Sequence, residues 1–247
     1  MPKLLVVESS AIVRGVFKKL LDEDTDFDYE IVETYSEAEK LLVKDSFEYA
    51  VVERKLSDSP DGEIIALLNK HDVAPLVFIE EVDEVFFESF ESAKIVDYII
   101  KQKYNNMSNV LNKLKHLQKN KDITILVLTT SHTYKDYLEQ NLKLNSFKVL
   151  TASSSGEALK KIENNPEISL IILDNEVVQE SSLEFVKSIR IYKNSDMLKI
   201  LILASEPNSY ATSKLLNAGA NDYIVKPFTR NEFYIRISQN IKIVGVE

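Results

Sequence analysis

Three short stretches in the first half of this 247-residue chain return in the same order in the second half. The pairs are KLLVVESS and TILVLTTS, EYAVVER and SLIILDN, and VDYIIK and NDYIVK, at offsets of 121, 121 and 125 residues. The constant order and nearly constant offset indicate two copies of one domain. The period is too long for a solenoid, so we expect tandem domains over residues 1–120 and 121–247.

Each copy alternates short apolar runs with stretches of helical pattern. The runs are rich in Val, Ile and Leu without polar alternation, as in strands that are buried on both faces. They cover 3–8, 29–33, 48–53, 75–80 and 96–100, then 123–129, 146–151, 169–174, 198–204 and 222–225. Each copy is therefore predicted to be a doubly wound, flavodoxin-like α/β domain, with a five-stranded parallel sheet and helices on both faces.

Helix signals lie between the strands. A capping-box spacing occurs at Ser36-x-x-Glu39, Ser154-x-x-Glu157 and Thr229-x-x-Glu232. The stretch 105–120 is also helical in pattern, with apolar residues on one side at Val110, Leu111, Leu114 and Leu117. This helix is predicted to end the first copy, with the domain boundary near 118–122.

Composition excludes several classes of function. The net charge of −9 disfavours a nucleic-acid-binding surface, and the absence of Cys removes disulfides, thiolate catalysis and Cys-ligated metal. With only 5 Gly, the chain has neither G-x-G-x-x-G nor a Walker A sequence. No apolar run approaches the roughly 20 residues of a membrane helix. We expect a cytoplasmic protein that contacts neither membrane nor nucleic acid.

Ligands of such sheets bind beyond the carboxyl ends of the strands. In the first copy these ends carry Glu8, Ser9, Glu53, Glu80 and Lys101, and in the second Thr129, Thr130, Asp174, Ala204 and Lys226. A single acid at such a place serves as a turn or helix cap in many proteins. An acid and a lysine at equivalent ends of both copies indicate a site.

The segment AGANDYIVKPFTRNEF, residues 218–233, resembles the closing segment of response-regulator receiver domains, with Lys226-Pro227-Phe228 as its most specific part. The first copy resembles the same family less strictly, through VVESS, DSPDGE and VDYIIK. The two resemblances cover essentially the whole chain. The combination looks like the N-terminal half of double-receiver diguanylate cyclases, in which a GGDEF output domain follows.

The resemblance implies a specific chemistry. A receiver accepts a phosphoryl group, from a sensor histidine kinase or a phosphotransfer protein, on an Asp after the third strand. Two acids after the first strand help to hold Mg²⁺, a Thr or Ser after the fourth strand bonds the phosphoryl group, and a Lys after the fifth pairs with it. The aromatic residue that switches between inward and outward packing corresponds to Tyr98 and Tyr223, and the alternative is that each is simply a half-buried strand tyrosine.

The first copy departs from this pattern. Glu53 stands at the acceptor position, Glu8-Ser9 at the acidic pair and Glu80 at the hydroxyl position, while Lys101 is kept. The extra methylene of Glu moves its carboxylate by roughly 1.5 Å, and a misplacement of about 1 Å can cost about a hundredfold in rate. We expect no phosphorylation of the first copy.

A Glu53–Lys101 pair would make it either a constant mimic of the phosphorylated state or a purely structural domain. Glu8, Glu53 and Glu80 could still collect a divalent ion.

The second copy departs differently. It keeps Asp174 as phosphoacceptor and Lys226, but Thr129 and Thr130 replace both acids, so Mg²⁺ would be held weakly by Asp174. Ala204 stands at the hydroxyl position, and the adjacent Ser205 is a possible substitute. The structural alternative is a simple Asp174–Lys226 ion pair.

Three functions follow. The first is a response regulator whose receivers control an output domain or partner by association, with homodimerisation through 208–217 and 229–242, where Phe233, Ile237 and Ile241 share one helix face. The second is the regulatory half of a diguanylate cyclase, whose catalytic sequence is absent from these residues. The third is a flavodoxin-like cofactor binder using the hydroxyl-rich loop 129–136, which lacks Gly, in a chain without Trp.

Overall fold

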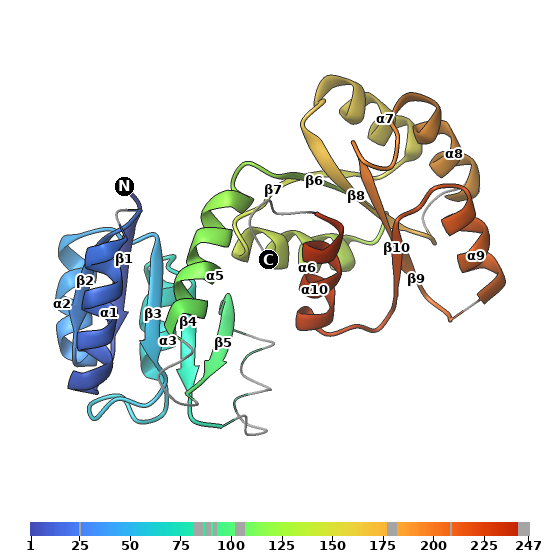
Figure 1. Ribbon diagram of the computed structural model, residues 1–247. Coiled ribbons are helices and arrows are strands. Elements are labelled where there is room, and N and C mark those ends of the chain that lie inside the picture. Colours follow the sequence, from blue (N-terminus) through green and yellow to red (C-terminus); the bar gives the residue numbers. More distant parts are fainter. Residues whose placement is uncertain are drawn as a thin grey trace. The chain divides into compact units, whose positions relative to one another are not determined.

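The computed structural model describes residues 1–24, 26–81, 86, 90, 93–101, 107–176, 182–207 and 209–241. The chain forms two compact units, Met1–Lys115 and His116–Glu247. The division falls within helix α5 (Met107–Asn120), a few residues before the expected boundary at 118–122. Each unit is described by itself below (Figure 1).

Unit 1 is built on five parallel strands in the order β2-β1-β3-β4-β5. Its elements before α5 are β1 (Lys3–Val7), α1 (Ala11–Glu23), β2 (Asp28–Val32), α2 (Tyr35–Lys44), β3 (Tyr49–Glu53), α3 (Glu63–Lys70), β4 (Pro75–Ile79) and β5 (Asp97–Ile100).

Unit 2 repeats this topology, with parallel strands in the order β7-β6-β8-β9-β10. Its elements after α5 are β6 (Thr124–Leu128), α6 (His132–Leu144), β7 (Lys148–Ala152), α7 (Ser155–Asn164), β8 (Ile168–Asp174), α8 (Ser182–Tyr192), β9 (Lys199–Ala204), α9 (Ser209–Asn217), β10 (Asp222–Val225) and α10 (Arg230–Asn240). The predicted fold class is confirmed for both units.

Both faces of the unit 2 sheet are covered by helices (Figure 1). One buried cluster joins strand residues to α7, α8 and α9, and a second joins the opposite face to α6 and α10. The inner strands bury nearly every side chain, as continuous apolar runs predict.

The register brings the strand ends together at one edge of each sheet. Val7 pairs with Val52, and Val52 with Val77, so β1, β3 and β4 end side by side. In unit 2, Asp174 pairs with Leu203 at the corresponding edge. The residues that follow these strands therefore meet, although they are far apart in the sequence.

Two local predictions need correction. Helix α2 begins at Tyr35 with Thr34 as N-cap, and its capping box joins Thr34 to Glu37, not Ser36 to Glu39. The predicted N-caps Ser154 and Thr229 do accept hydrogen bonds from the backbone of Glu157 and Glu232. The signal failed in α2 because two hydroxyl residues lie close together and each has a Glu three residues on.

The apolar face of α10 is also different from the expectation. Phe233, Ile237 and Ile241 lie in the core of unit 2 and are at most 7% exposed, so they are not available for dimerisation. A helix on a sheet must bury one stripe, and the spacing of these residues reflects that inward stripe. Tyr210, Leu216, Tyr223 and Ile235 are the exposed apolar residues of α9, β10 and α10.

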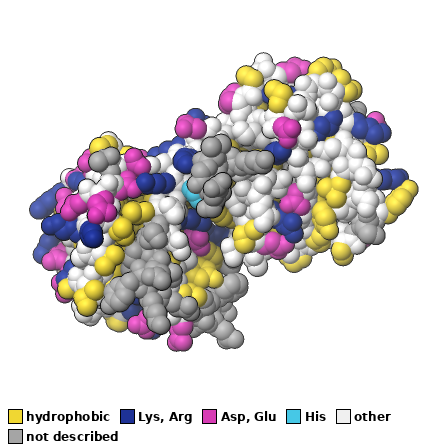
Figure 2. Space-filling model, viewed as in Figure 1, with side chains coloured by type: hydrophobic (Ala, Val, Ile, Leu, Met, Phe, Trp, Pro, Cys, Tyr) yellow, Lys and Arg dark blue, Asp and Glu magenta, His cyan; other side chains and the backbone are white. Residues whose placement is uncertain are grey.

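The visible surface is mixed in charge. Acidic and basic side chains are interspersed on the face shown in Figure 2. Within the described ranges, no helix combines the length and hydropathy needed to span a bilayer.

Candidate functional site

An ion-paired cluster lies at the carboxyl edge of the unit 1 sheet. Lys101, directly after β5, places its Nζ 2.9 Å from Glu8 Oε1 and 2.5 Å from Glu53 Oε1. The side chains of Glu8, Glu53 and Lys101 are 1%, 14% and 21% exposed, so the ammonium group bridges two largely buried carboxylates. The predicted Glu53–Lys101 pair is present, and Glu8 shares it.

Backbone and hydroxyl donors fix both carboxylates. Glu53 Oε2 accepts hydrogen bonds from the backbone N–H of Ser9, at 3.0 Å, and from the Ser9 hydroxyl. Glu8 Oε1 also accepts from the Ser10 N–H at 3.0 Å. Glu8 Oε2 is buried without a hydrogen-bond partner in the described part of the chain. The longer side chain of Glu53 thus reaches across to β1, which ties three strand ends together.

The electrostatics favour one charged state. Burial raises the pKa of the Glu8 carboxyl above its usual value, against the lowering effect of Lys101. Burial also acts to raise the pKa of Glu53, but hydrogen bonds from Lys101 and Ser9 hold that pKa below its usual value. Burial opposes the charge of Lys101, yet its bonds to Glu53 and Glu8 raise its pKa. Glu53 and Lys101 therefore form a charged pair at neutral pH.

The other unit 1 candidates lie around this cluster. Glu80 is exposed and lines a small hollow together with Glu53 and Lys101. Tyr98 is half-buried and packs into the core, with its ring 5.4 Å from that of Phe86 and 5.2 Å from that of Phe90, both edge to face. Tyr98 is therefore in the inward arrangement.

In unit 2, Asp174 ends β8 and is 1% exposed. Its Oδ1 accepts a hydrogen bond from Lys226 Nζ at 2.8 Å, and its Oδ2 accepts one from the Thr129 hydroxyl at 3.0 Å. The ammonium of Lys226 also lies 4.6 Å from the centre of the Tyr134 ring. The predicted Asp174–Lys226 pair is present, and Thr129 completes it while Thr130 is exposed to solvent.

Burial acts to lower the pKa of Lys226, but the hydrogen bond to Asp174 raises it above its usual value. The ammonium group therefore stays charged at neutral pH and neutralises the buried Asp174 carboxylate. This pair corresponds to the Glu53–Lys101 pair of unit 1, with the shorter acid.

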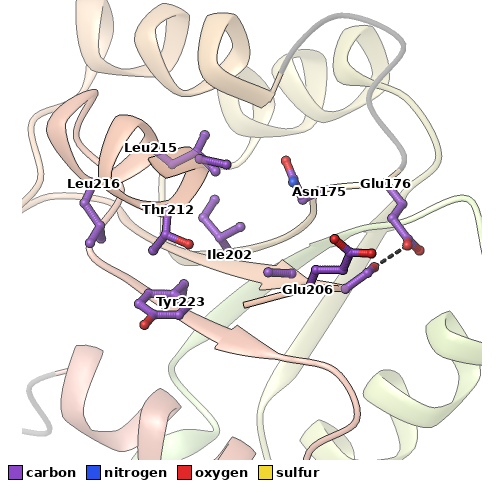
Figure 3. Close-up of a pocket in the computed structure, with 11 residues that line it drawn as sticks. Asn175, Glu176, Ile202, Glu206, Thr212, Leu215, Leu216 and Tyr223 are labelled. Atoms are coloured by element: carbon purple, nitrogen blue, oxygen red, sulfur yellow. Dashed lines mark hydrogen bonds between the residues drawn. The ribbon is translucent and has the colours of Figure 1, made fainter. Parts of the chain in front are cut away.

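Sequence reasoning missed Glu176, two residues after Asp174. Its Oε2 lies 3.4 Å from Lys226 Nζ, and its Oε1 accepts a hydrogen bond from the Ser205 hydroxyl (Figure 3). The predicted hydroxyl substitute, Ser205, is thus tied to a carboxylate. The run Asp174-Asn175-Glu176 was the available signal, since a second acid so close to a strand end lies at the same edge of the sheet.

Beside Ser205 lies a hollow of about 200 Å³. Its walls come from β9, α9 and β10, including Ile202, Thr212 and Leu215 (Figure 3). Tyr223 stands at its rim and is 38% exposed, in contrast to the inward Tyr98. The two units therefore hold equivalent tyrosines in different environments.

Comparison with known proteins agrees with this architecture. Residues 125–238 match the model of the response regulator receiver domain. The chain is 31% identical over 106 residues to a chemotaxis protein CheY homolog of Campylobacter jejuni, covering 42% of this chain and 82% of that protein. The chain belongs to the response regulator receiver family. As a receiver protein, it is part of the two-component class of signalling proteins.

Two further comparisons extend this result. The alkaline phosphatase synthesis transcriptional regulatory protein PhoP of Bacillus subtilis is 34% identical over 113 residues, which cover 46% of each chain. The chain therefore spans about half the length of this relative. A crystal structure described as a two-component system response regulator/GGDEF domain protein superposes with a TM-score of 0.84 over 98% of both chains, at 24% identity. That likeness shows the fold.

Receivers in general bind Mg²⁺ at the phosphorylation site, and the residues of this chain do not fit that ion well. In unit 1 the Lys101 ammonium lies between Glu8 and Glu53, where a cation would have to be. In unit 2 both oxygens of Asp174 already accept hydrogen bonds. Among the described residues, no three Asp, Glu or His side chains gather as a metal site requires.

Proposed function

We propose that this receiver chain is a regulatory module that controls an output domain or partner protein by association. In this proposal Asp174 of unit 2 can accept a phosphoryl group, whereas Glu53 of unit 1 cannot. The observation that carries the proposal is the Lys101 bridge between Glu8 and Glu53, at 2.9 and 2.5 Å. It gives unit 1 a permanent charge arrangement at the position where a receiver is phosphorylated and dephosphorylated.

The state of Tyr98 supports constant mimicry for unit 1 over a purely structural role. In the family this aromatic position changes its packing with the state of the site. Tyr98 packs inward in unit 1, which contains the Glu53–Lys101 pair, whereas Tyr223 is exposed in unit 2, which contains the Asp174–Lys226 pair. Unit 1 would then hold one signalling state, and unit 2 would remain able to change.

The partners in this proposal are a sensor histidine kinase or phosphotransfer protein, an output domain and a second copy of the chain. The exposed apolar residues Tyr210, Leu216 and Ile235 give α9 and α10 a surface for homodimerisation. Nucleic acid and membrane are not among the expected partners, because the chain has a net charge of −9. The absence of Cys fits a cytoplasmic location.

A second candidate is the regulatory half of a diguanylate cyclase. The observation in its favour is the likeness to the response regulator/GGDEF domain protein over 98% of both chains. The 247 residues contain no G-G-D/E-E-F sequence, so synthesis of cyclic-di-GMP would belong to a domain outside them.

Treatment with acetyl phosphate and Mg²⁺ tests the proposal. A carboxylate oxygen of Asp174 would attack phosphorus, the bond to the acetate oxygen would break, and acetate would leave with the electron pair. We expect slow, substoichiometric addition of one phosphoryl group at Asp174, measured by intact mass and peptide mapping. An adduct on Glu53, or rapid complete modification of both units, would contradict the proposal.

The variant Glu53→Asp isolates the role of the acceptor in unit 1. We expect acetyl phosphate to modify it poorly, at a rate below about a tenth of that of a receiver that uses Mg²⁺. The reason is that Ser9 and Glu80 still stand where the family has an acid and a hydroxyl. Mapping of the adduct measures this result, with Asp174→Asn as background to remove the signal of unit 2. Fast modification of the new aspartate at position 53 in that background would show that unit 1 lost only its acceptor.

A further inference from the structure

Glu176 binds the two groups on which a phosphoryl group at Asp174 would depend. Its Oε1 accepts the hydrogen bond of Ser205 (Figure 3), and its Oε2 lies 3.4 Å from Lys226 Nζ. The Glu176 side chain is 62% exposed, whereas that of Lys226 is 9% exposed. Glu176 therefore reaches into the site from its solvent side.

These contacts occupy groups that would otherwise bind a phosphoryl group. A serine hydroxyl has one proton to donate, and that of Ser205 is directed at Glu176. The Lys226 ammonium already lies 2.8 Å from Asp174 Oδ1 and over the ring of Tyr134. An anion added to Asp174 would therefore compete with Glu176 for the Ser205 hydroxyl and for the Lys226 ammonium.

The local charge acts in the same direction. Asp174 and Glu176 surround the single ammonium of Lys226, so an incoming phosphoryl donor meets one excess negative charge. The hydrogen bond from Ser205, followed by the charge of Lys226, lowers the pKa of Glu176, which keeps this carboxylate ionised at neutral pH. Because Glu176 is exposed, salt must weaken this repulsion.

We propose that Glu176 is a positioning residue that occupies Ser205 and Lys226 and so competes with the phosphoryl group at Asp174. This inference rests on the proposed role of Asp174 as phosphoacceptor. Under this inference, the slow phosphorylation expected at Asp174 is caused in part by the Glu176 carboxylate. Unit 1 has the exposed basic Lys55 two residues after Glu53, so it has no carboxylate at the position that corresponds to Glu176.

The full 247-residue chain is compared with Glu176→Gln, Glu176→Ala and the control Glu206→Ala. Glu206 is an exposed carboxylate that lines the same hollow. The first readout is the initial rate of acyl-phosphate formation at Asp174 from acetyl phosphate with Mg²⁺. The second is the affinity for beryllium trifluoride, a tetrahedral analogue of the phosphoryl group, measured by fluorine NMR. Both are repeated in 0.05 M and 0.5 M salt.

The rate and affinity should rise about fivefold for Glu176→Gln and about tenfold for Glu176→Ala, because a charge-assisted competitor is removed. Glu206→Ala should stay within about twofold of the original chain, as expected for an exposed surface charge. The gain from Glu176→Ala should shrink at 0.5 M salt, which a change in folding alone would not produce.

Equal or lower values for both Glu176 variants would overturn the inference and leave Asp174 as acceptor. If no protein forms an adduct or binds beryllium trifluoride, the inference fails together with the proposed role of Asp174 as phosphoacceptor. An adduct that maps away from Asp174 would instead contradict the proposed function.

Discussion

Replacing Lys101 by Met is expected to lower the free energy of unfolding of unit 1 by about 3 kcal/mol, because two buried carboxylates lose the cationic partner that they share. Glu8 and Glu53 are 1% and 14% exposed, so water cannot fully replace the ammonium group. Methionine keeps most of the apolar stem of Lys101, which limits the loss of packing. Urea unfolding measures the change, with hydrogen exchange in β1 and β3 to identify unit 1.

The pH dependence gives this prediction a sign. In the original chain the pKa of Glu53 is lower in the folded state than in the unfolded state, so Glu53 stabilises the fold at a pH above its unfolded-state pKa. This contribution is lost as the pH falls through the folded-state pKa. The raised pKa of Glu8 acts in the opposite direction. The raised pKa of Lys101 contributes stability that disappears only when the pH rises through it. Without Lys101 both carboxyl pKa values rise, so the variant should recover stability between pH 7.5 and pH 5.

Lys94→Met provides the matched control for this substitution. Lys94 pairs with Asp72 at 3.8 Å, and their side chains are 65% and 91% exposed. Its removal should change the free energy of unfolding by less than about 0.5 kcal/mol at either pH. A loss below about 1 kcal/mol for Lys101→Met would contradict the view that its pairs are effectively buried.

Introducing two acids at the end of β6, as Thr129→Asp with Thr130→Asp, should create a magnesium-dependent site in unit 2. Mg²⁺ would then accelerate acyl-phosphate formation at Asp174 by about a hundredfold, or ~2.7 kcal/mol of barrier, since a metal stabilises charge on the transferring group. The rate of adduct formation from acetyl phosphate, with and without Mg²⁺, measures this gain.

Stability should change in parallel. The double variant loses the bond from the Thr129 hydroxyl to Asp174 and places a second carboxylate beside it, so its melting temperature should fall without Mg²⁺. Mg²⁺ should restore the melting temperature by binding only the folded state. Thr133→Asp, which adds an exposed acid in α6, should respond to Mg²⁺ in neither assay. A double variant whose rate of adduct formation and melting temperature do not respond to Mg²⁺ would contradict this prediction.

The fold could be predicted because the repeat and the apolar strands agree with one another. Continuous apolar runs such as Leu126 to Leu128 have few alternatives to a strand covered on both faces. The predicted strands brought an acid and a lysine to one edge of each sheet, and the resemblance to receiver domains implied the pairing of Glu53 with Lys101 and of Asp174 with Lys226.

The details that failed depend on side-chain geometry. The third partner of the Lys101 cluster, Glu8, could not be distinguished from a metal ligand, since sequence shows the acid but not the ammonium beside it. The same holds for Glu176, because the sequence does not show that its side chain reaches Ser205 and Lys226. On α10, the apolar stripe that includes Phe233 predicts that one face of the helix is buried, either against the sheet of unit 2 or against a partner protein. In the structure this face contacts the sheet.

The bridge in unit 1 joins residues that are 93 and 48 positions apart in the chain. During synthesis Glu8 and Glu53 leave the ribosome well before Lys101, so a nascent sheet without β5 would hold two acids and no cation. Docking of the last strand is therefore coupled to neutralisation of the pocket. A fragment that ends before β5 should fail to form a stable sheet. We therefore expect the addition of β5 to be the folding step after which unit 1 is stably folded.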